Sequence, residues 1–397
     1  MDQNLHTAPA ARRTLVPRER IAVSLLFLVN GFMVGCWAPK IPEFAERLQL
    51  TKFELGLMIL VFGIGSLIMM PLAGAQIARY GSSRVAKVTG VLLLPSLLAL
   101  TLVQNVWTGA IAIFLFGGFI GAMDVAMNAN AVSVERSMRR AIMSSCHAFW
   151  SLGGLIGSAL GGLLIASWGV LGHSVLATVL AVLVLAAAWP MVLADHPHPS
   201  EEKAKSGLPL VPLPWLLGLM ALFCMIPEGA VLDWSALYLR QEMSASVALS
   251  GFGFAAFSLT MAAMRFAGDL VRDRFGAVKT FRVCTAFAIT GMLIAAVAPS
   301  AELAIIGFAI CGIGISNMVP IAFSAAGNIP GLAPGIGISV VTTMGYSGIL
   351  VAPSAIGFIA EHTGFSAVFM ALPVLLLVVL AFSGLARYAD GSGSVSH

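Results

Sequence analysis

Charged residues are scarce in this chain of 397 residues: Asp, Glu, Lys and Arg together make up 10%, whereas hydrophobic residues make up 59%. An ordinary soluble domain is about 25% charged and roughly 45–50% apolar. A chain with so little charge could not cover its own surface with polar groups in water. The composition therefore excludes a soluble enzyme, a disordered regulator, a disulfide-rich secreted domain and a nucleic-acid-binding protein.

Motifs for chemistry are missing as well. The 5 cysteines lie apart in apolar runs and form no C-x-x-C pair, so we expect buried thiols rather than disulfides or metal ligands. The chain has no G-x-x-x-x-G-K phosphate-binding motif, so ATP is not expected as an energy source. The sequence thus predicts no enzymatic activity, no cofactor, no metal site and no nucleic-acid partner.

Long apolar runs, by contrast, are abundant. A helix of about 20 residues crosses the roughly 30 Å hydrocarbon core of a membrane. The runs predict an all-α membrane protein with twelve transmembrane helices, at about residues 21–39, 54–77, 85–104, 108–133, 142–167, 173–194, 214–238, 249–271, 280–298, 303–325, 336–360 and 366–386.

The distribution of Lys and Arg predicts the orientation of these spans. With the N-terminus inside, the inner segments hold 18 of the 22 cations, Arg265 among them, and the outer segments hold Lys40, Arg47, Lys52 and Arg240. Positively charged loops favour the cytoplasmic side. We therefore expect a multi-pass protein of the bacterial inner membrane with both termini in the cytoplasm.

A polar stretch and an internal repeat divide the chain into two halves. At an offset of 195 residues, Arg79-Tyr80-Gly81 corresponds to Arg274-Phe275-Gly276. Two parallel six-span repeats are one design of secondary transporters, with the substrate site near the midplane between them. We predict a tail over 1–20, a six-helix bundle over 21–194, a linker over 195–213, a second pseudo-symmetric six-helix bundle over 214–386 and a tail over 387–397.

The loops after the second and eighth predicted spans resemble the signature G-x-L-x-D-R-x-G-R-R of the major facilitator superfamily. The first copy runs from Gly74 to Arg84 and has Ala78 at the acidic position, whereas the second, which begins at Gly268, keeps Asp273. The resemblance implies a major facilitator fold whose two bundles rock against each other. It assigns gating roles to Arg79, Gly81, Arg84, Asp273, Arg274 and Gly276.

One further gating hypothesis depends on that implied fold. Glu135 and Arg136 end the fourth predicted span near Arg79 and Arg84. We expect Glu135 to pair with one of these arginines when the inner gate is closed. The alternative is a solvated surface pair, which contributes little to stability.

Within the superfamily, the sequence is most similar to the fucose permease group of sugar–proton symporters and their bacterial relatives. The similarity rests on Asp124 with Asn128, on Glu228 six residues before Trp234, and on the stretch 318–324. Ala38 stands where the permease has an aspartate in its first span. One of the group's two key carboxylates is therefore missing, which weakens the analogy with a hexose transporter, and the solute expected is sugar-like or another small metabolite.

Asp124 is the first candidate for proton coupling. A carboxylate inside a membrane costs several kcal/mol on most scales and therefore needs a reason. Gly117, Gly121, Asp124 and Asn128 share one helix face, which suggests a helix that lines a cavity. The alternative is a structural acid bonded to a neighbouring helix.

Glu228 is the second candidate for proton coupling. It lies about midway along the seventh predicted span, directly between Pro227 and Gly229. Proline frees a backbone carbonyl and glycine loosens the helix, so we expect the helix to be broken here.

Other polar and aromatic side chains in the spans are candidates for substrate binding. Each could instead form a hydrogen bond between helices. For His147 we leave open a proton relay or a packing role, and Asp233 could also be an interfacial acid. The full set is Asn30, Asn128, His147, Trp150, Asp233, Trp234, Asn317 and Tyr346.

Together these features predict a secondary active transporter that takes up a small polar solute with protons by alternating access. We expect it to act as a monomer in the lipid bilayer. Proton-driven efflux of a drug or metabolite is the alternative within transport, and a non-transporting membrane sensor is the alternative from another class. A large, mostly aromatic cavity would favour efflux, and a cavity rich in Asn, Asp and Glu would favour uptake.

Overall fold

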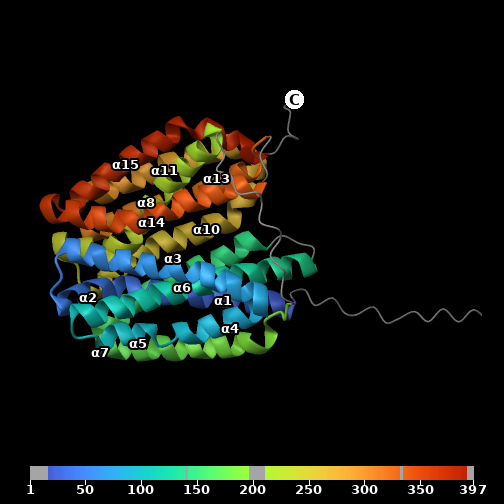
Figure 1. Cartoon of the computed structure of the whole chain (residues 1–397). Helices are drawn as coiled ribbons and strands as arrows, with labels where there is room; N and C mark the ends of the chain where they lie inside the picture. The colour runs from blue at the N-terminus through green and yellow to red at the C-terminus, as the bar shows by residue number, and fades with distance from the viewer. Residues whose placement is uncertain (1–16, 139–141, 196–210, 331–333, 391–397) are drawn as a thin grey trace, which may run out of the picture.

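The structure is a computed structural model that describes residues 17–138, 142–195, 211–330 and 334–390. Every regular element in these ranges is a helix, and the long helices lie side by side along one direction (Figure 1). The elements of the first half are α1 (Arg18–Trp37), η1 (Ala38–Lys40), α2 (Ile41–Leu48), α3 (Lys52–Tyr80), α4 (Ser82–Leu93), α5 (Ser96–Leu102), α6 (Val106–Met138), α7 (Met143–Ala188) and η2 (Trp189–Met191).

The second half repeats this arrangement beside the first. Figure 1 shows it as the yellow-to-red layer of helices next to the blue-to-green layer. Its elements are α8 (Pro212–Glu242), α9 (Val247–Ser250), α10 (Phe252–Phe275), α11 (Ala277–Val297), α12 (Ala301–Ile315), α13 (Met318–Gly327), α14 (Pro334–Thr363), α15 (Phe365–Ala381) and η3 (Ser383–Asp390).

The helices account for twelve membrane spans. Among the described residues, 10 stretches are long and apolar enough to cross a membrane, and α15 with η3, bent by 54°, adds an eleventh. One stretch, Ser145–Met191, has 47 residues, roughly 70 Å of helix and more than twice the hydrocarbon thickness. It reverses at Gly169, where φ is 72°, and a Cβ on Gly161 would lie 3.3 Å from Nε2 of His173 across the turn. This stretch is therefore two spans, and the predicted twelve-helix fold is confirmed.

The two ends of the bundle differ in their contacts. The end that carries Arg20, Asp195 and Asp390 is called proximal, and the end that carries Lys52 and Arg240 is called distal. At the distal end, the turns between successive spans have four residues or fewer: 49–51, 103–105, 169, 243–246, 298–300 and 364.

Helix breaks do not fall where the sequence predicted one. The helix α8 runs without interruption through Pro227, contrary to the expected break. Proline removes one backbone hydrogen bond, and the packing of α8 against α14 supports the helix on either side of it. Breaks occur instead at Pro95, between α4 and α5, and at Asn317, between α12 and α13.

Glycines let α1 and α7 approach backbone to backbone. A Cβ on Gly31 would lie 2.0 Å from the carbonyl oxygen of Trp150, and a Cβ on Gly153 would lie 2.2 Å from that of Leu28. Small residues allow this close contact between membrane helices, where van der Waals packing replaces the hydrophobic drive.

The same device corrects one prediction about α6. A Cβ on Gly117 would lie 2.0 Å from the carbonyl oxygen of Phe62, and a Cβ on Gly121 would lie 2.1 Å from Oγ of Ser66. These two glycines therefore pack α6 against α3 and do not line a cavity. Successive helical positions are 100° apart, so residues spaced by three and four lie on a broad face of the helix. One edge of this face, with Gly117 and Gly121, packs against α3, and the other edge, with Asp124, borders the cavity.

Two carboxylates cap helices at the proximal end in the same way. Asp195 accepts hydrogen bonds from the backbone N–H groups of Ser82 and Ser83, both at 2.9 Å. Asp390 accepts from the N–H of Ala277 at 3.0 and 3.1 Å. The sequence placed Asp195 in the linker and Asp390 in the tail; both belong to the folded bundles because each satisfies a helix N-terminus.

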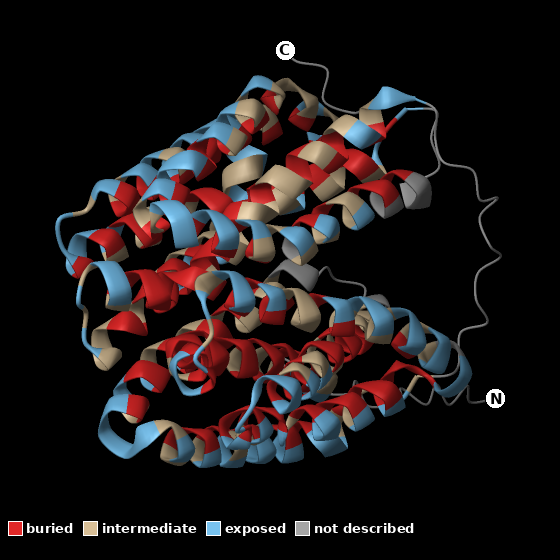
Figure 2. Ribbon diagram, turned by 60° about the vertical axis from the view of Figure 1, so that its left-hand side comes forward, coloured by how far each residue is buried: buried red, intermediate tan, exposed pale blue. Residues whose placement is uncertain are grey.

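The buried residues lie between the helices, and the exposed ones face outward (Figure 2). Many outward-facing side chains are large and apolar, such as Trp107, which is 81% exposed, and Leu270, which is 74% exposed. Apolar groups on the outside suit a surface that faces lipid rather than water.

Candidate substrate and proton site

A cavity of about 390 Å³ lies between the two halves. Its volume is in the range of small-molecule sites, roughly 300–1,000 Å³. Five of its nine lining residues have polar side chains, and Asp124 is the charged one among these described residues. The walls come from α3 (Leu67, Met70), α6 (Asp124, Val125) and α14 (Thr342, Thr343, Tyr346, Ser347, Leu350).

On the distal side of this cavity, α3 and α14 close against each other. A Cβ on Gly56 would lie 2.7 Å from the carbonyl oxygen of Pro353, so the two backbones touch. Nζ of Lys52 donates to the carbonyl oxygen of Ala360 at 3.0 Å. The N–H of Phe53 donates to a carboxylate oxygen of Glu361 at 2.8 Å. The same two helices that are separated by the cavity are therefore sealed at their distal ends.

A second contact between the halves reinforces this seal. Arg240 of α8 forms ion pairs with Glu43 at 2.6 Å and with Glu46 at 3.0 Å, both on α2. One guanidinium thus holds two carboxylates of the opposite half.

Asp124 enters the cavity from α6 with one oxygen free. The side-chain amide of Asn128, one turn further along, donates to Oδ1 of Asp124 at 3.2 Å and to its backbone carbonyl at 2.9 Å. Oδ2 has no hydrogen bond to any residue that the structure describes. Tyr346 lines the same cavity. The structure therefore brings together three of the predicted site residues, Asp124, Asn128 and Tyr346.

Glu228 has a cation as its partner. Nη2 of Arg265 lies 3.6 Å from Oε1 of Glu228. Arg265 also donates to Oγ of Ser151 at 3.0 Å and to the carbonyl oxygen of Ser316 at 3.3 Å. Because Ser151 belongs to α7 of the first half, this one guanidinium connects Glu228 to the opposite half.

Several predicted substrate contacts form links between helices instead. Asn30 accepts from Nε1 of Trp150 at 2.9 Å and donates to the carbonyl oxygen of Ile120 at 3.2 Å, which joins α1, α6 and α7. The ring of His147 packs edge-on against Phe27. None of these residues lines the cavity in this conformation, so their contact with a substrate stays a prediction.

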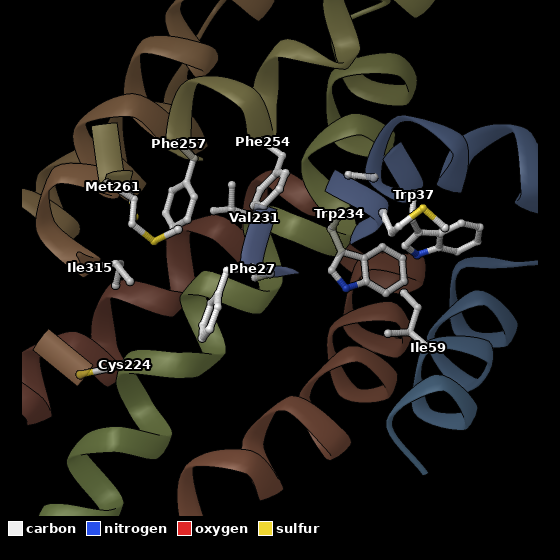
Figure 3. Close-up of a cluster of buried hydrophobic side chains, with 14 of the residues drawn as sticks. Phe27, Trp37, Ile59, Cys224, Val231, Trp234, Phe254, Phe257, Met261 and Ile315 are labelled. Carbon is white, nitrogen blue, oxygen red and sulfur yellow. The ribbon is translucent and has the colours of Figure 1, made fainter. Parts of the chain in front are cut away.

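Asn317, Asp233 and Trp234 also lie away from the cavity wall. The side-chain amide of Asn317 donates to Oγ of Ser316 at 3.2 Å, at the break between α12 and α13. Asp233 and Trp234 lie on the distal part of α8. Figure 3 shows Trp234 among the buried apolar side chains where the halves meet, with Trp37 and Ile59 of the first half.

Comparison with known proteins identifies this architecture. The family model described as Major Facilitator Superfamily matches residues 23–232 and 217–395. The chain belongs to the major facilitator superfamily. Members of this superfamily are carriers, so the protein is a multi-pass membrane transporter and not an enzyme.

Relatives and solved structures extend along almost the whole chain. An uncharacterized MFS-type transporter of Yersinia pestis is 36% identical over 368 residues, 91% of this chain and 94% of the relative. The membrane protein MosC of Rhizobium meliloti is 33% identical over 98% of this chain and 94% of the relative. The crystal structure of a D-xylose–proton symporter has a TM-score of 0.72 at 13% identity, covering 91% of this chain and 95% of that one. The E. coli fucose:proton symporter FucP has a TM-score of 0.62 at 18% identity, covering 92% and 97%. At these identities the solved structures show the fold alone.

The two superfamily signature loops lie at the proximal end. Gly81 and Gly276 have φ of 83° and 76°, a conformation that favours glycine, and each ends one helix directly before the next. Four charged residues of these loops are exposed: Arg79, Arg84, Asp273 and Arg274. The side chains of Glu135 and Arg136 lie outside the described residues, so the latch between Glu135 and an arginine stays a prediction.

Sequence reasoning missed Arg265 and the cavity hydroxyls. Arg265 was counted among the inner cations, although it lies within the apolar run of α10 and could have been flagged by the rule that singled out Asp124. Thr342, Thr343 and Ser347 carried no comparable signal, because small hydroxyl residues are common in membrane helices.

Proposed function

We propose that the protein takes up a small polar solute together with protons, with Asp124 as the proton-coupling group. The observation that carries this proposal is that Asp124 is the charged residue, among those described, in a cavity between the two halves that four further polar side chains also line. Placing a carboxylate in the membrane costs free energy, and such residues usually have a function. An acid that reaches one side of the membrane and then the other, with the solute beside it, couples the two movements.

The direction of opening follows from the distribution of cations. The described Lys and Arg residues gather at the proximal end, which we infer to be cytoplasmic by the positive-inside rule. The distal seal between α3 and α14 then closes the outer side, and the cavity faces inward. The proximal cations are Arg18, Arg20, Arg79, Arg84, Lys87, Arg272, Arg274, Lys279, Arg282 and Arg387.

The lining of the cavity supports a solute that is polar rather than aromatic. Tyr346 is its one aromatic residue among those described, and the hydroxyl groups of Thr342, Thr343 and Ser347 line α14. Hydroxyl groups both donate and accept hydrogen bonds, which suits a solute rich in hydroxyl or amide groups. A drug-efflux cavity would be expected to be larger and mostly aromatic.

Glu228 is inferred to act as the second acid of the cycle. Its ion pair with Arg265 compensates its charge in this conformation. Because Arg265 also bonds to Ser151 of the opposite half, movement of the halves would break that contact and change the surroundings of Glu228. Asp124, which has no cation partner among the described residues, is therefore the first-choice carrier of the proton.

The test begins by finding a ligand and then separates exchange from accumulation. Purified protein is screened by thermal shift against sugars, polyols, amino acids and organic acids at several pH values. With the ligand found, Asp124→Asn in proteoliposomes should still exchange labelled for unlabelled solute, and should lose at least tenfold of the accumulation driven by a pH gradient. Accumulation at the wild-type level by Asp124→Asn would overturn the proposal.

A further inference from the structure

A second, much smaller cavity lies distal to the first, between α8 and α14. It has a volume of about 10 Å³, close to the space that a single water molecule needs. Asp233 and Trp234 of α8 and Pro353 and Ile356 of α14 are among its walls. A cavity of this size holds at most one water molecule in this conformation.

Asp233 has no partner in this cavity. It is 9% exposed, and no hydrogen bond or ion pair joins it to any residue that the structure describes. The adjacent Trp234 is fully buried, and its Nε1–H lacks an acceptor. An ionised carboxylate without a partner costs several kcal/mol in such surroundings, and a bound proton removes that cost.

Two cations of the distal end, Arg240 and Lys52, are engaged elsewhere. Arg240 pairs with Glu43 and Glu46, and Nζ of Lys52 bonds to Ala360. Besides Asp233, the described ionisable side chains on the elements packed against α8, and on α3 and α8 themselves, are Lys40, Glu43, Glu46, Arg47, Lys52, Glu54, Arg79, Tyr80, Cys224, Glu228, Tyr238, Arg240, Glu242, Arg265, Arg272, Asp273, Arg274, Glu302, Cys311, Tyr346, Glu361 and His362. None of them forms an ion pair with Asp233.

The distal seal runs across the wall of this cavity. Pro353, which lines the cavity, is the residue whose carbonyl oxygen α3 touches through Gly56. At Gly357, one turn further, the ring of Trp234 and the carbonyl oxygen of Lys52 both approach the position of a Cβ, at 3.1 and 2.4 Å. Separation of α3 from α14 would therefore uncover Pro353 and Gly357 of α14, which lie beside Asp233 and Trp234.

We infer that Asp233 is a further proton-binding group, which exchanges its proton with the distal side when Asp124 is closed off. Asp124 lies in the cavity on the proximal side of the α3–α14 contact, and Asp233 lies behind that contact. The two carboxylates would then be accessible in opposite conformations. This inference rests on the proposed proton-coupled cycle and adds to it the site at which protons enter from outside.

Chemical labelling of locked full-length protein tests the inference. Dicyclohexylcarbodiimide, which modifies protonated carboxyl groups in apolar surroundings, is applied in lipid nanodiscs, and the modified peptides are measured by mass spectrometry. A short bis-thiol reagent closes the distal end in K52C/E361C and the proximal end in M70C/T343C. We expect Asp233 to react at least fivefold faster in the proximally closed form, and Asp124 to react at least fivefold faster in the distally closed form.

The labelling rates of Asp233 and Asp124 distinguish failure of this inference from failure of the proposed cycle. Equal rates at Asp233 with the expected change at Asp124 would overturn this inference and leave the proposed cycle intact. Equal rates at both carboxylates would overturn the cycle and this inference with it.

A second measurement does not depend on the cross-linked variants. At neutral pH, the infrared band of protonated carboxylic acids should be weaker in Asp233→Asn than in the wild type, and Asp233→Glu should retain it. An unchanged band in Asp233→Asn would show that Asp233 carries no proton and would overturn the inference.

Discussion

Asp195 and Asp390 are 195 residues apart, and each accepts backbone N–H groups at the start of the helix that follows a signature loop. Gly81 and Gly276, which directly precede those helices, are separated by the same 195 residues (276 minus 81). The repeat therefore includes the last described residue of each half. The repeat thus includes a capping contact as well as a sequence motif. In each half, an aspartate accepts hydrogen bonds from the N-terminus of the helix that follows the signature loop.

The cap formed by Asp195 should be measurable as a pH-dependent contribution to stability. Burial raises the pKa of Asp195, but the hydrogen bonds from Ser82 and Ser83 outweigh burial and hold that pKa below its usual range. Asp195→Asn should lower the free energy of unfolding by about 0.5–2 kcal/mol at neutral pH, as other N-cap losses do. Because the pKa is depressed in the folded state, this contribution is complete above the unfolded pKa, about 4, and is lost as pH falls through the folded pKa.

Thermal unfolding in detergent between pH 7 and pH 3 checks this prediction. The difference in Tm between wild type and Asp195→Asn should shrink as the pH falls. Asp273→Asn is the matched control, because Asp273 is exposed and has no ion pair among the described residues. A Tm difference that stays constant down to pH 3 would contradict the assigned cap.

Glycines at helix contacts and glycines in open space should respond oppositely to alanine. Gly31→Ala places a Cβ 2.0 Å from the carbonyl oxygen of Trp150, so α1 and α7 would have to separate, and we expect a loss of about 1–3 kcal/mol. Gly74→Ala has no heavy atom within 4 Å of the new Cβ, and we expect a gain of about 0.5–1 kcal/mol from helix propensity. Thermal unfolding of both variants provides the comparison, and a loss for Gly74→Ala equal to that for Gly31→Ala would contradict the packing model.

The ion pairs of Arg240 should bias the transporter toward the distally closed form. Ion pairs near the surface contribute about 0.2–1 kcal/mol each, so the loss of both pairs in Arg240→Ala should raise the distally open population roughly two- to thirtyfold. The readout is labelling of Ser354→Cys, at the α3–α14 seal, by a thiol reagent applied from the distal side. Arg47→Ala is the control, because Arg47 bonds to the carbonyl oxygens of Leu100 and Thr101 within its own half. Equal labelling of the two variants would remove Arg240 from the seal.

The pair of Glu228 and Arg265 should behave as a coupled unit in stability measurements. Removal of either partner leaves the other charge in the membrane interior without compensation. Glu228→Gln and Arg265→Gln should each lower Tm, and the double variant should lose less than the sum, with a coupling of about 0.5–3 kcal/mol. Thermal unfolding of the four proteins completes the cycle, and strictly additive losses would show that the ion pair does not act as a unit.

The fold could be predicted from the sequence because a membrane leaves few alternatives. Apolar runs of sufficient length must be helices, and their number, twelve, follows from hydropathy and the positions of Lys and Arg. The candidate site could be predicted only in part, because many kinds of side chain are possible at each position of a membrane helix. Asp124 stands out because a charge in an apolar run is rare, whereas the hydroxyl of Ser347 looks like any other small helix residue.

Tertiary contacts decided the remaining cases. Pro227 predicts a break by its local chemistry, but its neighbours keep α8 continuous. Asp195 looks like the first residue of a polar linker, and only the backbone N–H groups of Ser82 and Ser83, more than 110 residues earlier, give it a structural role. A local sequence pattern cannot predict a hydrogen-bond partner that is so distant along the chain.

The shortness of the distal turns limits what a protease or an antibody could bind on the distal face. With four residues or fewer in each turn, the distal face has no loop of the kind that proteases nick or that tolerates an inserted epitope. A protease added to that side should leave the chain whole, and an antibody would find almost nothing to bind apart from the closed seam of α3 and α14. Contact between the distal face and the medium is thereby concentrated on the seal between α3 and α14.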